Sequence, residues 1–311
     1  ILIVSVFQTF TLKYFLWYYL PKGQSIAVFD KQELKNIKRF ATGMLGISFT
    51  AVLLTQIDKV ILSKILSLEQ FGYYSIACSL GLLIYQIIGP ITQSYFPKFT
   101  SLISLIKTEE LKNTYHQASQ LVSVLVLPAT FILFFFSKEL IFIWSKDLNF
   151  TENTWLITSI YAFGTGMNGL MNIPYVLTLS YGWTKLAFYQ NIIFLIIMAP
   201  LTFFLALNYG AIGGAISWAT INTLYFLVTP TLIHNKYLKG EVVNWYWNDS
   251  LKPLIASFIV VLIAKNYLEL TDLNSFKQTI LIVIIGCISV FSSLLFADNL
   301  KKIILHKMIK S

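Results

Sequence analysis

The chain has 311 residues, of which 56% are hydrophobic and only 12% are charged, and its net charge at neutral pH is +9. An ordinary soluble domain carries roughly 25% charged residues, so this composition excludes a soluble protein and indicates a membrane protein. The excess of basic residues does not indicate nucleic acid as a partner, because no Lys/Arg cluster is interleaved with aromatic residues in the way a nucleic-acid surface requires.

Nine apolar segments, most of them long enough for a helix to cross a bilayer, follow one another along the chain. They span residues 1–20, 40–62, 73–97, 119–143, 155–180, 187–207, 211–233, 253–270 and 278–297. The clearest evidence lies between Leu186 and Asn235, where no Lys, Arg, Asp or Glu occurs and a turn at 208–210 separates two crossings. The sequence therefore predicts a polytopic helical bundle.

The distribution of basic residues predicts the orientation of this bundle. Alternate loops, at 21–39, 98–118, 181–186, 234–252 and 298–311, contain sixteen of the 23 Lys and Arg residues. Loops that stay in the cytoplasm carry the positive excess, so we expect this set, including the C-terminal tail, to be cytoplasmic. The loops 59–72, 138–154, 208–210 and 265–277 would then be outside. The first segment would run inward, as an even-numbered helix of a longer protein does, so we expect the chain to be a fragment.

Two of the predicted cytoplasmic loops resemble membrane anchors. In residues 30–41, Leu34, Ile37 and Ala41 recur at helical spacing among charged residues, which predicts an amphipathic helix on the membrane surface. The aromatic run at 245–247 is predicted to lie at the level of the lipid headgroups.

Polar residues inside the predicted crossings form stripes that indicate a cavity. Ionisable residues in a crossing are costly and mark candidate functional sites; here they are Lys13 and the pair Asp58 and Lys59. The stripes, each on one helical face, are Ser48, Thr55 and Asp58; Ser75, Ser79, Gln86 and Gln93; and Thr158, Thr165, Asn168, Asn172 and Tyr175. Buried amides must be paired, so these stripes either join neighbouring helices or line a hydrated cavity of uncharged hydrogen-bonding groups. For Asp58 and Lys59, local capping and snorkelling to the headgroups stay open as alternatives.

Several short motifs resemble those of one family. Asp58-Lys59 end the second segment, Phe71-Gly72-Tyr73-Tyr74-Ser75 follow a short loop, and Phe96-Pro97-Lys98 close the next segment. Together with residues 55–80 as a whole, they resemble the start of the C-terminal lobe of Wzx-type bacterial polysaccharide flippases of the MOP superfamily. We expect the resemblance to cover the C-terminal two-thirds of the chain.

This resemblance implies an all-α integral membrane fold, MOP/MATE-like, with about nine transmembrane helices here out of an expected 14. It divides the chain into the last helix of an N-terminal lobe (1–20), a cytoplasmic amphipathic linker (21–39), a C-terminal six-helix lobe (40–233), a second cytoplasmic linker (234–252), two additional helices (253–297) and a basic cytoplasmic tail (298–311).

The implied function is transport without a cofactor or a metal: a flippase in the bacterial cytoplasmic membrane that translocates an undecaprenyl-diphosphate-linked oligosaccharide. The expected partners are this lipid-linked oligosaccharide, membrane lipids and the polysaccharide polymerase machinery. The candidate cavity residues are Lys13, Thr55, Asp58, Lys59, Ser79, Gln86, Gln93, Asn168, Asn172 and Tyr175, with Lys13 attracting the diphosphate and Asp58 carrying a proton if transport is ion-coupled.

Three alternatives share parts of this pattern. A MATE-type drug exporter and a lipid II flippase have the same fold, although the latter normally has several cavity arginines and this chain has only Arg39. A polysaccharide polymerase or ligase is the alternative of another class. The expected large outer loop of such enzymes, with Arg or His, is missing from the predicted outer loops.

Overall fold

A computed structural model of the chain describes residues 2–19, 29–268 and 274–301. Part of the first linker and most of the basic tail, including Lys307 and Lys310, lie outside the described residues. The chain separates into two compact units, Ile1–Ala41 and Thr42–Ser311. The first contains α1 (Leu2–Tyr19) and the beginning of α2 (Lys31–Ile65). The amphipathic segment and the first predicted crossing of the lobe are thus parts of a single helix.

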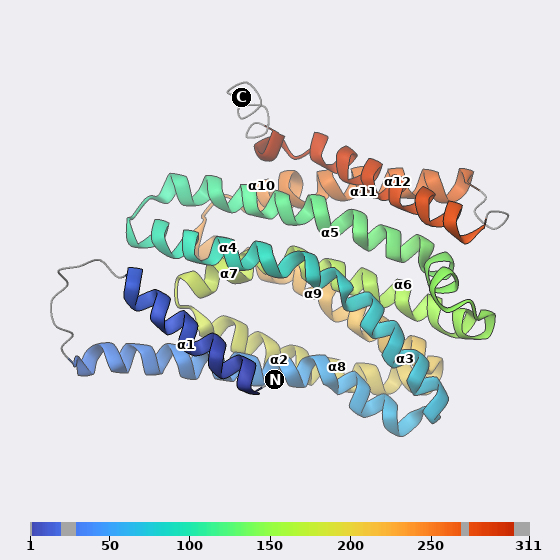
Figure 1. The fold of residues 1–311 in the computed structure, drawn as a ribbon, viewed down its shortest axis with the longest axis horizontal. Coiled ribbons are helices and arrows are strands. Elements are labelled where there is room, and N and C mark those ends of the chain that lie inside the picture. Colours follow the sequence, from blue (N-terminus) through green and yellow to red (C-terminus); the bar gives the residue numbers. More distant parts are fainter. Residues whose placement is uncertain (1, 20–28, 269–273, 302–311) are drawn as a thin grey trace. The chain divides into compact units, whose positions relative to one another are not determined.

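The second unit is a bundle of helices, and no strand occurs in the described residues (Figure 1). After α2 come α3 (Leu68–Gly81), a 3₁₀ turn η1 (Leu82–Ile84), α4 (Tyr85–Ser104), α5 (Thr108–Ser145), α6 (Leu148–Leu170), α7 (Asn172–Ser180), α8 (Thr184–Tyr209) and α9 (Ala211–Tyr237). The chain continues through α10 (Val242–Asn244), a π-helical turn η2 (Trp245–Leu251), α11 (Lys252–Tyr267) and α12 (Ser275–Leu295). The last two long helices pack against α5.

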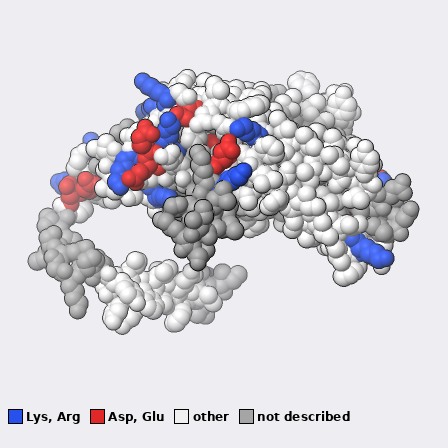
Figure 2. Space-filling view, turned by 90° about the horizontal axis from the view of Figure 1, so that it is seen from above, with Lys and Arg blue, Asp and Glu red and all other residues white. Residues whose placement is uncertain are grey.

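Within the described ranges, seven helical segments are long and apolar enough to cross a membrane; one of them joins α3 to α4 and another joins α10 to α11. Each contains all or nearly all of one predicted crossing. The crossings predicted at 1–20 and 155–180 have no counterpart among the seven. The latter corresponds to α6 and α7. Helix α6 packs against α3, α5 and α9, so protein covers most of its surface and its Thr and Gly residues are buried away from lipid. The charged residues on the face shown in Figure 2 gather near the helix ends and leave a broad uncharged band, as a membrane-spanning bundle requires.

Local sequence explains where several helices begin and break. Ser67 and Gln70 form a capping box that starts α3, and the Asp147 side chain accepts the Phe150 N–H at the start of α6. Between α6 and α7 the helix is interrupted at Met171, three residues before Pro174. Proline has no N–H for the carbonyl four residues earlier, which belongs to Leu170, the last residue of α6.

Two apolar clusters surround α6 and place it at the centre of the bundle. One joins α4, α5, α7 and the pair α11 and α12, and its largest members include Phe99, Tyr115, Phe136 and Met171. The other joins α2, α3, α8 and α9, and it includes Leu62, Tyr74, Met198 and Trp218. Because α6 contributes to both clusters, its polar side chains are held at fixed positions in the interior.

Close packing of α6 against α9 requires Gly164. A Cβ atom at this position would lie 2.7 Å from the Ala219 Cα, which is a backbone atom that cannot rotate away. We expect Gly164→Ala to lower the free energy of unfolding by about 1–3 kcal/mol, the usual cost of overpacking. The measurement is a denaturant titration of the purified protein in detergent.

Gly72→Ala is the matched control, because nothing lies within 4 Å of a Cβ atom at this position in α3. The same substitution there should raise the free energy of unfolding by about 0.5–1 kcal/mol, since alanine is the better helix former. Equal effects at the two positions would contradict the packing of α6 on α9.

Candidate ligand cavity

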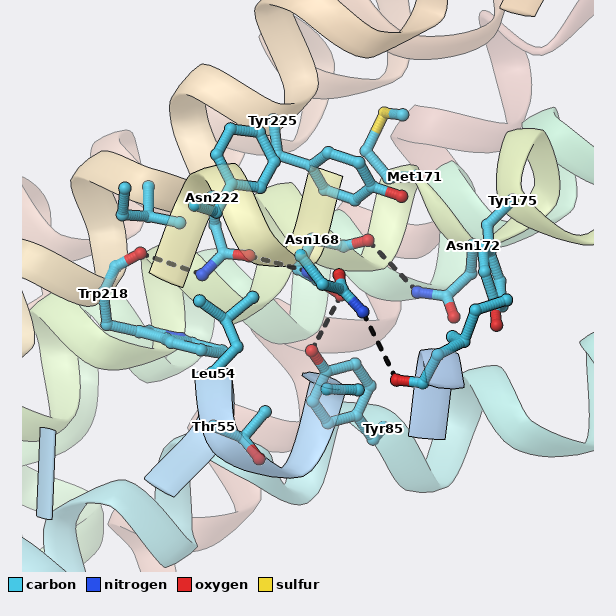
Figure 3. Close-up of a pocket in the computed structure, with 15 residues that line it drawn as sticks. Leu54, Thr55, Tyr85, Asn168, Met171, Asn172, Tyr175, Trp218, Asn222 and Tyr225 are labelled. Atoms are coloured by element: carbon cyan, nitrogen blue, oxygen red, sulfur yellow. Dashed lines mark hydrogen bonds between the residues drawn. The ribbon is translucent and has the colours of Figure 1, made fainter. Parts of the chain in front are cut away.

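A cavity of about 240 Å³ lies inside the second unit (Figure 3). Helices α2, α4, α8 and α9 and the break between α6 and α7 form its wall. The lining residues are Ile47, Ala51, Leu54, Thr55, Tyr85, Asn168, Met171, Asn172, Tyr175, Asn191, Phe194, Trp218, Ile221, Asn222 and Tyr225. Four of the candidate residues expected from the sequence meet there: Thr55, Asn168, Asn172 and Tyr175.

A chain of hydrogen bonds crosses the cavity wall and centres on Asn168. The Tyr85 hydroxyl donates to the Asn168 Oδ1 at 2.8 Å, and the Asn168 Nδ2 donates to the Asn222 Oδ1 at 2.6 Å (Figure 3). The Asn222 Nδ2 in turn donates to the Trp218 carbonyl at 2.8 Å. These bonds join α4, α6 and α9 and set which way each amide group points.

A second asparagine bridges the helix break. The Asn172 Nδ2 donates to the carbonyls of Asn168 and Gly169, at 3.1 and 3.3 Å. A third lining asparagine joins α8 to α2, since the Asn191 Nδ2 donates to the Thr50 Oγ1 at 3.2 Å. The amide groups are therefore held by protein contacts before any ligand arrives.

The cavity is polar but carries no charge, since none of the described residues that line it is Lys, Arg, Asp, Glu or His. Amides and tyrosine hydroxyls can donate and accept hydrogen bonds, while Trp218, Phe194 and the tyrosine rings offer apolar faces. This combination suits a neutral ligand with several hydroxyl groups. It offers no counter-charge for a diphosphate or a cationic drug.

The acidic residue of the α2 stripe does not line the cavity. Asp58 is fully buried one turn beyond Thr55, and its Oδ2 accepts a hydrogen bond from the Tyr74 hydroxyl at 2.5 Å. Its Oδ1 has no partner among the described residues. Lys59 is half-buried and its Nζ donates to the Gln56 Oε1 at 3.3 Å. The Asp58 contact thus joins α2 to α3, and the polar stripe reaches the cavity only at Thr55.

The remaining candidates lie elsewhere. Ser79, Gln86 and Gln93 share one face of α3 and α4, as their spacing predicts, but this face is exposed and does not line the cavity. Lys13 is exposed in α1, which belongs to the first unit.

A buried network near the start of α5 was missed by the sequence analysis. The His116 Nδ1 lies 2.5 Å from the Asp249 Oδ2, and its Nε2 lies 3.1 Å from the Glu241 Oε2. The Gln120 Nε2 donates to the Asp249 Oδ1 at 2.9 Å, and its Oε1 accepts the amides of residues 299 and 300 at 2.9 and 3.2 Å. A neutral imidazole has only one N–H, so donation to both carboxylates requires a protonated His116.

The network ties the second linker to α5. Lys112 forms an ion pair with Glu241 at 2.6 Å. Burial of the Glu241 carboxylate raises its pKa, but the bonds from Lys112 and Asn244 outweigh burial and hold the pKa below its usual value. Trp245 is only 1% exposed and its Nε1 donates to the Ser119 Oγ, so the prediction of an interfacial anchor is wrong for this residue. The signal that could have shown the network is the spacing of His116 and Gln120, which lie four residues apart and so share one face of α5.

The fold is that of a polytopic helical membrane protein, and its interior contains an uncharged polar cavity. Residues 1–145 match the family model described as "Polysaccharide biosynthesis protein". The "Putative O-antigen transporter" of Shigella flexneri is 24% identical over 188 residues, which cover 60% of this chain and 44% of that relative. The aligned part of the chain therefore spans less than half the length of that relative. No solved structure matches the chain.

These matches confirm the resemblance to polysaccharide flippases that the motifs between residues 55 and 98 indicate. The family match extends to residue 1, outside the C-terminal two-thirds in which we expected the resemblance.

Proposed function

We propose that this chain is part of a flippase that moves an undecaprenyl-diphosphate-linked oligosaccharide across the bacterial cytoplasmic membrane, with the C-terminus on the cytoplasmic side. The uncharged cavity around Asn168 is the observation that carries the proposal. The match to a polysaccharide biosynthesis family and the likeness to a protein called an O-antigen transporter support it. The polysaccharide polymerase machinery would receive the product.

The cavity would bind sugar and not the diphosphate. Its 240 Å³ is smaller than the pockets of about 300–1,000 Å³ that enclose a drug-sized ligand, so it would hold part of a repeat unit. Hydroxyl groups of that sugar would exchange hydrogen bonds with Asn172 and Tyr175, while Trp218 offers a flat apolar surface. A cationic drug would find no carboxylate in this lining, which disfavours the exporter alternative.

The exposed polar face of α3 and α4 would form a second wall of the transport path. Ser79, Gln86 and Gln93 lie within a helical segment that is apolar enough to cross a membrane. Amide groups that face hydrocarbon are costly, so this face needs water or another polar surface opposite it. Transporters of repeat architecture bind substrate between their halves, and this face would serve that role. Lys13 and Lys59 remain the candidates for the diphosphate.

The test is complementation of a flippase-null strain with the full-length gene that contains this region. Return of surface polysaccharide is the expected result. A gain of drug resistance without polysaccharide would overturn the proposal in favour of an exporter. If neither polysaccharide nor drug resistance is gained, the proposal is overturned for the repeat unit that this host makes. Asn172→Leu and Gln86→Leu should each lower the amount of surface polymer at an unchanged protein level in the membrane.

A further inference from the structure

A second hollow of about 460 Å³ lies at one end of the second unit, away from the cavity around Asn168. It is formed by the first two turns of α3, by residues 152–157 of α6 and by the turn between α8 and α9 with the start of α9. Figure 1 shows these segments at the end of the bundle opposite the turn between α7 and α8. The lining residues are Gln70, Tyr73, Glu152, Asn153, Trp155, Leu156, Ile157, Tyr209, Gly210, Ala211 and Ile212.

Three aromatic rings face this hollow, and two of them are positioned by contacts with neighbours. The Tyr73 hydroxyl donates to the Glu69 Oε1 at 2.9 Å, and its ring packs edge-on against Phe150 with centroids 5.7 Å apart. Trp155 is half-buried, with the Lys138 Nζ 5.9 Å from its ring centroid. Tyr209 is 60% exposed and precedes Gly210, whose φ of +58° makes the tight turn into α9.

The polar groups around these rings are amides and one neutralised carboxylate. Gln70 and Asn153 are exposed at the rim. Glu152 is the one charged residue of the described lining, and it forms an ion pair with Lys138 at 2.7 Å. The lining therefore contains no cation for a phosphate and no unpaired carboxylate for an amine. Aromatic faces with amides at their edges fit a sugar ring, whose C–H groups stack on the rings while its hydroxyls bond to the amides.

The hollow lies where a transported sugar would leave the protein, at the predicted outer face. Its residues lie in, or within three residues of, the loops 59–72, 138–154 and 208–210, which contain few Lys and Arg residues and are predicted to be outside. A belt of interfacial aromatic residues would also occur at this level, but belt residues point separately toward lipid. Here Tyr73, Trp155 and Tyr209 come from three segments and line one hollow.

We propose that this hollow is a second sugar-binding site, on the outer face, for a neutral sugar of the oligosaccharide that the proposed transport function delivers there. The inference rests on that function for the source of its ligand. The outer site would hold the sugar after it leaves the cavity around Asn168, and it would take no part in binding the diphosphate.

The experiment measures binding of a soluble probe to the purified full-length protein in lipid nanodiscs by calorimetry. The probe is the repeat-unit oligosaccharide, released by mild acid from the lipid carrier that accumulates in the flippase-null strain. The wild-type protein should bind it, and Tyr209→Ala should weaken binding at least fivefold. Tyr189→Ala is the matched control, because Tyr189 is 58% exposed on the same helix α8 but outside the hollow.

Trp155→Leu should weaken binding further, and Trp247→Leu, which alters a 52% exposed tryptophan in η2, should leave it unchanged. Absence of binding to the wild type, or equal binding by the Tyr209 and Tyr189 variants, would overturn the outer site. The outcome is separate from that of the transport proposal. Complementation can succeed while the outer site fails, and binding lost only in the Tyr209 and Trp155 variants would establish the site even without complementation.

Discussion

Asp249→Leu is expected to destabilise the protein by about 3–5 kcal/mol, the usual cost of removing one partner from a buried ion pair. Asp249 is fully buried, and its two oxygens accept hydrogen bonds from His116 and Gln120 of α5. Without it, the His116 Nδ1 and the Gln120 Nε2 lose their acceptor in the interior. The second linker, which leads to α11 and α12, would lose its main polar contact with the lobe.

The measurement is the free energy of unfolding of the purified protein in detergent, at neutral pH. Glu110→Leu is the control, because Glu110, in the first turn of α5, forms an exposed ion pair at 2.9 Å with Lys107, the residue that precedes this helix. Removing an exposed pair should change the free energy of unfolding by no more than about 1 kcal/mol. A similar loss in the two variants would show that the Asp249 network contributes little.

Asn168→Ala is expected to lower the amount of surface polysaccharide at least tenfold in the complemented strain. Its amide group both accepts from Tyr85 and donates to Asn222, so the substitution removes the central member of the chain that crosses the cavity. Two interior polar groups are left without partners, at about 1–3 kcal/mol each, and the polar wall offered to a sugar is lost.

Asn208→Ala is the matched control, since Asn208 is exposed near the end of α8 and does not line the cavity. Tyr85→Phe separates function from folding. It keeps the ring and removes only the hydroxyl that donates to Asn168, so the protein level should be unchanged while polymer falls. Wild-type polymer from cells with Asn168→Ala would contradict a role for this cavity in transport.

The membrane-spanning helices could be predicted from the sequence because the bilayer imposes a simple rule. A segment without charges and about 20 residues long satisfies its backbone hydrogen bonds only as a helix. The segments 187–207 and 211–233 follow this rule, and α8 and α9 contain them. Segment 155–180 departs from this rule. Its first part, in α6, is surrounded by protein, and the segment is interrupted at Met171, between α6 and α7.

The candidate site was only partly predictable for a geometric reason. Helical spacing shows which residues share a face, and it correctly grouped Asn168 with Asn172 and Gln86 with Gln93. It does not show what each face meets. The first pair faces a cavity inside the bundle, while the second lies on the exposed side of α4.

By itself, the sequence determined that this is a helical membrane protein with uncharged polar stripes, because charge and hydrophobicity act locally along the chain. Only the tertiary structure decided which polar groups pair. Asn168 bonds to Asn222, 54 residues later, and His116 bonds to Asp249, 133 residues later. Such pairs depend on how α6 packs on α9 and how the second linker returns to α5, and no periodicity within a single helix encodes that packing.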